Sequence, residues 1–276
     1  MKYLKRNLLL TDDLTTHYAI KYPDPLQAPI QFVIEPHSIK IRCYIKYTPE
    51  LLEPYELYSH KRLEGFKSVE SYIPDDYLQT KDLYYTYADA IEEAIKLFWE
   101  GEYSFSWYSH NKSDKLPVSI EFIRLNDPTA SFNPVQHFAR IYFASKISVS
   151  SSVKSSLHRR FWGFFRNHSF EGIELNWAVS HPGSMYLKRC KQLEAFQRVV
   201  AHEFGHMLGI GDAYGASYRL FYQADGTSNF MMCHGHQVQP QEIEMALRAH
   251  QTNKLQSFPI KFSIKAIMQT LRRKFA

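Results

Sequence analysis

Residues 199–212 read VVAHEFGHMLGIGD, and this stretch decides how the rest of the chain is interpreted. Apolar side chains recur at three- and four-residue steps through Phe196, Val200, Phe204 and Met207. Such spacing is typical of a helix with one buried face. The sequence therefore predicts a helix over about 188–208 that carries the polar residues of the stretch on its other side.

Two histidines and a glutamate on this helix have the arrangement of a catalytic metal site. His202 and His206 are four residues apart, so they lie one above the other and aim their imidazoles at one point, as a tetrahedral Zn²⁺ requires. Glu203 lies one step round the helix, where it can take a proton from a zinc-bound water and pass it to a leaving amine. Gly209 can end the helix with a positive φ and turn the chain back. That turn would bring Asp212 to the metal as the third ligand.

The pattern resembles that of the metzincin zinc peptidases, His-Glu-x-x-His-x-x-Gly-x-x-His/Asp, and its aspartate variant is similar to the snapalysin-like branch. Carried over by position, the resemblance implies that His202, His206 and Asp212 bind Zn²⁺ and that Glu203 is the general base. It implies hydrolysis of peptide bonds without a covalent intermediate. The resemblance is strong over about residues 185–250.

The resemblance also implies a methionine turn beneath the metal, some tens of residues downstream. Residues 229–235 (NFMMCHG) suit this role, with Met231 as the first choice and Met232 as the second. In several metzincins a tyrosine follows the turn and stabilises the oxyanion, whereas here the neighbourhood carries histidines. We therefore take His234, with His236 beside it, as a candidate oxyanion stabiliser, and Tyr214 as a candidate lining residue of the cleft.

Three alternatives remain open at this point. In a gluzincin-type site, Glu242 from a later helix would be the third ligand, which leaves Gly209 and Asp212 without a role. The chain could instead be a non-catalytic binding module stabilised by zinc, although a structural site has no use for Glu203. In a third interpretation the C-terminal tail binds a membrane or partner, and peptidase activity is secondary.

The pattern of elements predicts an α+β domain. Strands are expected at 39–47, 118–125, 139–149 and 172–180, and helices at 82–100, 188–208 and 239–250. The metzincin resemblance adds a mixed, mostly parallel twisted sheet with an active-site helix. Residues 172–180, which precede that helix, are a candidate edge strand for an extended peptide, and an inner strand fits them equally well.

Domain organisation follows from composition. We expect a proline-rich extended arm at 1–37, a catalytic domain at 38–253 and a basic amphipathic tail at 254–276. The chain has 276 residues and a net charge of +5, but the tail alone holds six basic residues and no acid. The remainder carries 27 basic and 28 acidic residues, which argues against nucleic-acid binding by the whole protein.

The expected partner is a peptide or protein substrate, and we expect a monomer. A basic amphipathic tail can also contact an anionic membrane surface or a partner. Three cysteines form no disulfide framework. No apolar run reaches the length of a membrane span, and the N-terminal run of three leucines is too short for a signal peptide. We therefore expect a cytoplasmic protein or one exported by a signal-less route.

Overall fold

The computed structural model describes residues 20, 22, 24–52, 86–105, 115–125, 137–143, 151–160, 162, 175–188, 193–214, 224–233 and 235–259. Most of the expected arm and of the expected basic tail lies outside these residues, as does His234. No helix among the described residues has the length and apolarity needed to cross a membrane.

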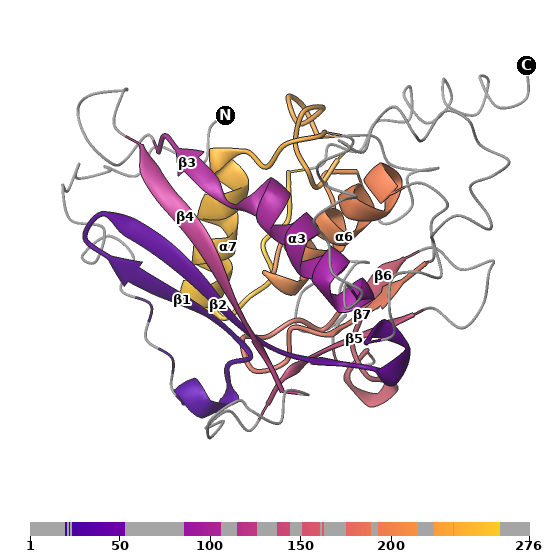
Figure 1. Cartoon of the computed structure of the whole chain (residues 1–276). Helices are drawn as coiled ribbons and strands as arrows, with labels where there is room; N and C mark the ends of the chain where they lie inside the picture. The colour runs from indigo at the N-terminus through magenta and orange to yellow at the C-terminus, as the bar shows by residue number, and fades with distance from the viewer. Residues whose placement is uncertain are drawn as a thin grey trace, which may run out of the picture.

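The described residues form a mixed sheet of seven strands (Figure 1). Its strands are β1 (Ile30–Glu35), β2 (Ser38–Tyr47), β3 (Gly101–Tyr103), β4 (Leu116–Arg124), β5 (Ala139–Phe143), β6 (Ser152–Lys154) and β7 (Ser184–Leu187). Their order is β3-β4-β2-β5-β7-β6, and β1 is a further partner of β2. Strands β4, β2, β5 and β7 run parallel, whereas β1, β3 and β6 each pair antiparallel with a neighbour.

Strand β2 is the longest and connects both halves of the sheet. Its alternating residues Ile39, Ile41, Cys43 and Ile45 are fully buried, as the alternating sequence predicts. Over its first part β2 pairs with β1 and β4, and over its last residues it pairs with β5. Strand β1 comes from the region expected to be an extended arm, and a hairpin at residues 36–37 returns it onto β2.

Three α-helices pack with this sheet: α3 (Tyr87–Trp99), α6 (Leu193–Met207) and α7 (Pro240–Thr252). Two short 3-10 helices, η1 (Pro25–Gln27) and η2 (Pro49–Leu51), flank the first hairpin. Helices α3 and α6 lie side by side, with α3 against β4 and α6 against β6 and β7 (Figure 1). Each helix falls inside a predicted range or within two residues of it, and the mixed architecture is compatible with the predicted α+β class.

One strand prediction is wrong. Residues 175–177, within the predicted strand 172–180, have no strand structure, and Ala178 makes only an isolated bridge to His181. The strand at the end of the sheet next to α6 is instead β6. The apolar residues alternate in the sequence of 172–180, but residues 175–179 are all buried, so this alternation does not mark one buried face of a strand.

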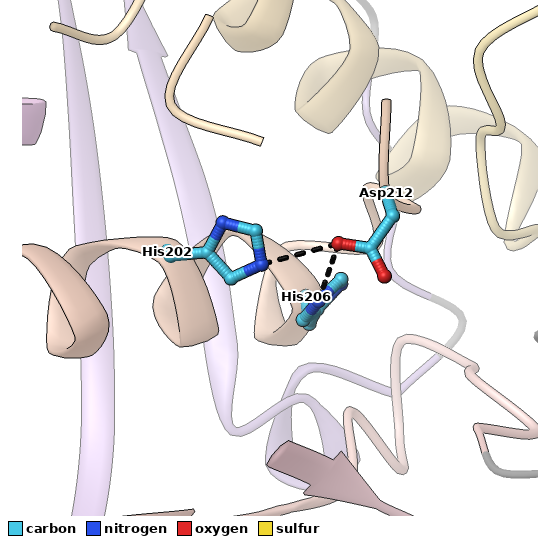
Figure 2. Close-up of side chains that lie close together, drawn as sticks. All are labelled: His202, His206 and Asp212. Atoms are coloured by element: carbon cyan, nitrogen blue, oxygen red, sulfur yellow. Dashed lines mark ion pairs between the residues drawn. The ribbon is translucent and has the colours of Figure 1, made fainter. Parts of the chain in front are cut away.

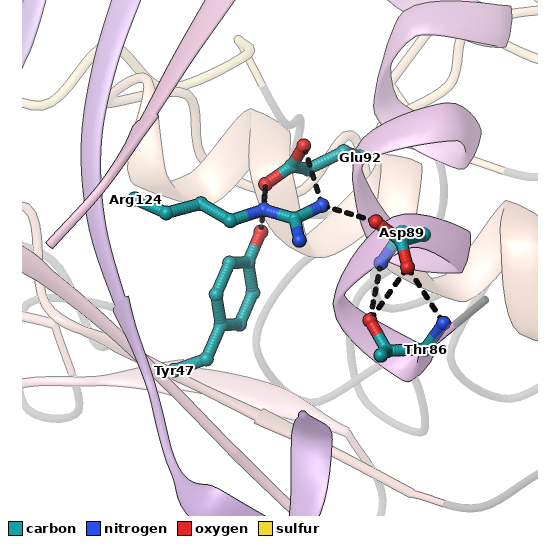
Figure 3. Close-up of polar contacts among 5 residues, drawn as sticks. All are labelled: Tyr47, Thr86, Asp89, Glu92 and Arg124. Carbon is teal, nitrogen blue, oxygen red and sulfur yellow. Dashed lines mark hydrogen bonds and ion pairs between the residues drawn. The ribbon is translucent and has the colours of Figure 1, made fainter. Parts of the chain in front are cut away.

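Helix α3 is attached to the sheet by a cluster of charged side chains (Figure 3). Arg124 of β4 donates hydrogen bonds to Asp89 and, at 2.7 Å, to Glu92, and the Tyr47 hydroxyl donates to Glu92 at 3.0 Å. Asp89 also closes a capping box with Thr86 at the start of α3. Burial alone would raise the pKa of Asp89, but the hydrogen bonds from Arg124 and Thr86 outweigh it and hold that pKa below its ordinary value.

Replacing Arg124 by alanine should lower the free energy of unfolding by about 1–3 kcal/mol, because it leaves two half-buried carboxylates side by side. Urea denaturation at pH 7 measures this loss. The loss should shrink below about pH 4, where the depressed pKa of Asp89 no longer favours the folded state.

The matched control is Arg42→Ala, which breaks the more exposed ion pair with Glu121. It should cost less than about 1 kcal/mol. Equal losses for the two variants would show that the Arg124 cluster does not anchor α3.

Candidate metal centre

The chain reverses direction immediately after α6, and Gly209 makes this possible. Gly209 has φ of 89°, a left-handed conformation that favours glycine. The Ile210 N–H bonds to the Gly205 carbonyl at 3.1 Å and the Gly209 N–H to the His206 carbonyl at 3.0 Å. These two bonds form a Schellman motif, which ends the helix and sends Asp212 back towards it. The predicted turn is therefore confirmed.

The side chains of His202, His206 and Asp212 converge next to this turn (Figure 2). Asp212 Oδ1 lies 3.1 Å from His202 Nε2 and 3.4 Å from His206 Nε2. One ligand atom from each residue lies within 4.8 Å of the other two, so the group could hold a metal ion. Zinc bonded tetrahedrally to nitrogen and oxygen at about 2.0–2.1 Å places its ligand atoms about 3.3 Å apart, and both measured separations fit that spacing.

Main-chain carbonyls fix the orientation of both imidazoles. His202 Nδ1 lies 2.9 Å from the Met231 carbonyl, and His206 Nδ1 lies 2.8 Å from the Ile210 carbonyl. A carbonyl only accepts hydrogen bonds, so each Nδ1 carries the proton. Nε2 of each ring therefore faces Asp212, and it is the nitrogen that can bind a metal ion in place of a proton.

The three groups interact strongly through their charges. Burial would lower the pKa of His206, but attraction to Asp212 outweighs it and raises that pKa to about 10. Burial would likewise raise the pKa of Asp212, and the two imidazoles instead hold it well below its ordinary value. A positive charge placed among these atoms is therefore favoured, whether it is carried by a proton or by a metal cation.

Glu203 lies beside this group and is almost completely buried, with 5% of its surface exposed. The backbone N–H of Val153 in β6 favours the charged form of its carboxylate, whereas its Oε2 is buried without a hydrogen-bond partner among the described residues. Burial raises the pKa of Glu203. A buried carboxylate oxygen without a hydrogen bond is rare, and it suits a group that receives a proton during a reaction.

Two tryptophans hold α6 on either side of the histidines. The Trp99 indole N–H donates to the Ala201 carbonyl at 2.8 Å, and the Trp177 indole N–H donates to the Met207 carbonyl at 3.0 Å. Both side chains are fully buried. These contacts fix the helix segment that carries both histidines relative to α3 and to the loop before β7.

The paired methionines contact the motif in two ways. Met231 is buried and offers its carbonyl to His202. Met232 packs its sulfur beneath Gly205, where a Cβ atom would lie only 2.2 Å from that sulfur. Gly205, which stands between the two histidines in the sequence, therefore leaves room for the side chain of Met232. The assignment of Met231 as the methionine turn remains a prediction.

Tyr214 is brought to the site, as the sequence suggested. Its ring stacks on His202 with an interplanar angle of 13°, and its hydroxyl lies 3.5 Å from His202 Nε2. Burial raises the pKa of Tyr214, and the nearby carboxylates of Asp212 and Glu203 raise it further, so the phenol keeps its proton. His236 instead accepts a hydrogen bond from Arg198 at 3.0 Å on the surface.

Glu242 does not join the imidazoles. Its side chain is fully buried, and it accepts hydrogen bonds from the backbone N–H groups of Met231, Met232 and Gln239 at 3.2, 2.7 and 2.7 Å. Burial raises its pKa to about 7, although these three donors favour the charged form. The alternative in which Glu242 is the third metal ligand therefore receives no support.

Sequence reasoning missed the groups that hold the site together. The carbonyls of Met231 and Ile210 and the N–H of Val153 belong to the main chain, so no residue type marks them. Only Glu242 left a signal, because it occupies the third position of a helix that begins with proline, where a carboxylate accepts N–H groups.

Comparisons with protein-family models, with curated proteins and with solved structures find no match to this chain. The resemblance to metzincins therefore remains a prediction that rests on the motif and its spacing.

Gly209→Ala should destabilise the protein by about 2–5 kcal/mol. A left-handed alanine costs about 1–2 kcal/mol, and its Cβ would lie 2.7 Å from the ring of Trp177, which adds an overpacking cost of about 1–3 kcal/mol. Chemical denaturation of metal-free protein measures the loss.

Gly226→Ala is the matched control, because Gly226 also has a positive φ, of 77°, but has no atom within 4 Å of an added Cβ. It should cost only the backbone part, about 1–2 kcal/mol. Similar losses for the two variants would contradict the close approach of Trp177.

Proposed function

We propose that this protein is a zinc-dependent endopeptidase. The observation that supports this best is the convergence of His202, His206 and Asp212 beside the unpartnered buried oxygen of Glu203. A structural zinc site normally has four protein ligands, whereas a catalytic site has three and leaves a position for water or substrate. Two imidazole nitrogens and one carboxylate oxygen are a donor set that zinc accepts.

When bound, zinc would supply a Lewis acid that polarises the scissile carbonyl and lowers the pKa of a water molecule. Glu203 then takes a proton from the attacking water and delivers it to the leaving amine nitrogen. Its raised pKa makes the carboxylate a stronger base for the first of these steps. Oε2 of Glu203, which has no hydrogen-bond partner among the described residues, is the oxygen that remains for the proton.

Tyr214 is the candidate for stabilising the oxyanion. Its protonated hydroxyl lies close to both Asp212 and His202, and it can donate a hydrogen bond to a negatively charged oxygen that forms there. His234, the other candidate from the sequence, lies outside the described residues.

Strand β6 is the best candidate for positioning an extended peptide. It is the last strand in the order of the described sheet, and its Val153 contacts Glu203 directly. A peptide added along such an edge gains main-chain hydrogen bonds and lies beside the catalytic carboxylate. This replaces the earlier candidate at residues 172–180.

Asp212→Asn should lower zinc affinity by more than about 100-fold, because it removes the only anionic ligand of the group. Competition with a chromophoric chelator measures the affinity, with Asp225→Asn in an exposed loop as the control. Unchanged affinity in Asp212→Asn would mean that another residue supplies the third ligand.

Glu203→Gln should retain about one zinc per chain and lose peptide cleavage by a factor of at least about 100. Metal analysis and digestion of a peptide library measure the two properties. The control is Glu194→Gln, at an exposed position in the first turn of the same helix, which should retain both.

Equal cleavage by Glu203→Gln and the wild type would refute the mechanism. Stoichiometric zinc with no cleavage by any variant, the wild type included, would favour the non-catalytic binding module.

A further inference from the structure

A single peptide group connects Glu242 to His202. The peptide between Met231 and Met232 offers its carbonyl to His202 Nδ1, at 2.9 Å. The N–H of the same peptide, which belongs to Met232, donates to Glu242 Oε1 at 2.7 Å. The two bonds lie on opposite sides of one planar group, so they form a continuous chain from the carboxylate to the imidazole.

We propose that Glu242 is a positioning residue of the metal centre, which acts on His202 through the Met231–Met232 peptide. Metal-binding histidines commonly donate their second N–H directly to a carboxylate or to a carbonyl. Here the two arrangements are combined. The Met231 carbonyl accepts the hydrogen bond from His202, and the Glu242 carboxylate accepts a hydrogen bond from the N–H of the same peptide. This inference needs the metal site of the proposed function, but it does not need peptide hydrolysis.

The chain of hydrogen bonds from Glu242 to His202 is expected to act on the imidazole electrostatically. Hydrogen bonds in a chain polarise one another, and a negative charge at the N–H end of a peptide makes its carbonyl a stronger acceptor. A stronger acceptor at Nδ1 makes Nε2 of His202 a better electron donor towards a cation. The side chain of Glu242 is fully buried, so solvent does not weaken this interaction.

The contacts of Glu242 also fix the position of the peptide. Oε2 accepts the N–H groups of Met231 and of Gln239, the residue that precedes α7. The carboxylate therefore ties the start of α7 to the loop that holds His202. Rotation of the 231–232 peptide would break the bonds at both of its ends, so His202 is restrained to one orientation.

Glu242→Gln tests the role of the charge, because glutamine has almost the same shape and keeps one acceptor oxygen. Zinc affinity of the full chain, measured by chelator competition, should fall by about 10-fold or more. Glu244→Gln, on the same helix and half-buried, is the control and should stay within about twofold of the wild type. Circular dichroism of the metal-free proteins reports whether each variant is folded.

A second measurement uses the unaltered chain, in case Glu242→Gln does not fold. Met231 and Met232 are the only consecutive methionines in the sequence. Labelling methionine with both carbonyl ¹³C and ¹⁵N therefore gives one coupled peptide signal, from this peptide alone. Zinc should shift both the carbonyl and the amide resonance of this peptide, because the metal changes the polarisation of all the hydrogen bonds between His202 and Glu242.

A folded Glu242→Gln protein with wild-type zinc affinity would overturn the inference, and so would a 231–232 signal that does not move when zinc binds. Neither result would affect the assignment of Glu203 as the general base. Conversely, a wild-type chain that binds zinc and cleaves no peptide would refute the proposed function while leaving the role of Glu242 intact. A wild-type chain that binds no zinc would refute both.

Discussion

The reversal of the chain at Gly209 is the constraint on which the site depends. Two histidines on one helix face supply two ligand atoms, but a helix cannot supply a third from the same side at the required distance. Gly209 has a left-handed conformation directly after the last turn of α6, so the helix stops there. The two hydrogen bonds of the Schellman motif fix the direction in which the chain leaves the helix. Asp212 then reaches both imidazoles from beyond the helix end.

The rest of the fold keeps this short segment in place. Trp177 packs so closely on Gly209 that no larger residue fits, and Trp99 and Met232 pack beneath Gly205. Close packing therefore explains why both positions are glycine, whereas backbone conformation requires glycine only at Gly209. Helix α6 is thus positioned by large apolar side chains that approach its backbone closely, and its polar face carries His202 and His206.

The sequence was sufficient to predict that His202, His206 and Asp212 converge and that the chain turns at Gly209, because these residues are marked by residue type and spacing. It also predicted β2 and α3, whose alternating and helical patterns match their buried faces. It failed at 172–180, because the apolar residues alternate there in the sequence although residues 175–179 are all buried and 175–177 form no strand. It left Glu242 open as an alternative ligand, because a buried carboxylate that binds backbone N–H groups and one that binds a metal look alike in sequence.

Two buried glutamates close to the site illustrate how environment separates their roles. Glu242 has main-chain donors at both oxygens, so its carboxylate is held in one place. Glu203 has a buried oxygen with no hydrogen-bond partner in the part of the chain that the structure describes, so it retains the capacity to accept a proton. Leaving that oxygen without a hydrogen bond costs stability, and a fold that needed only a metal for its folding would gain by satisfying it. The contrast between these two carboxylates is therefore the strongest physical argument that the site is built for a reaction.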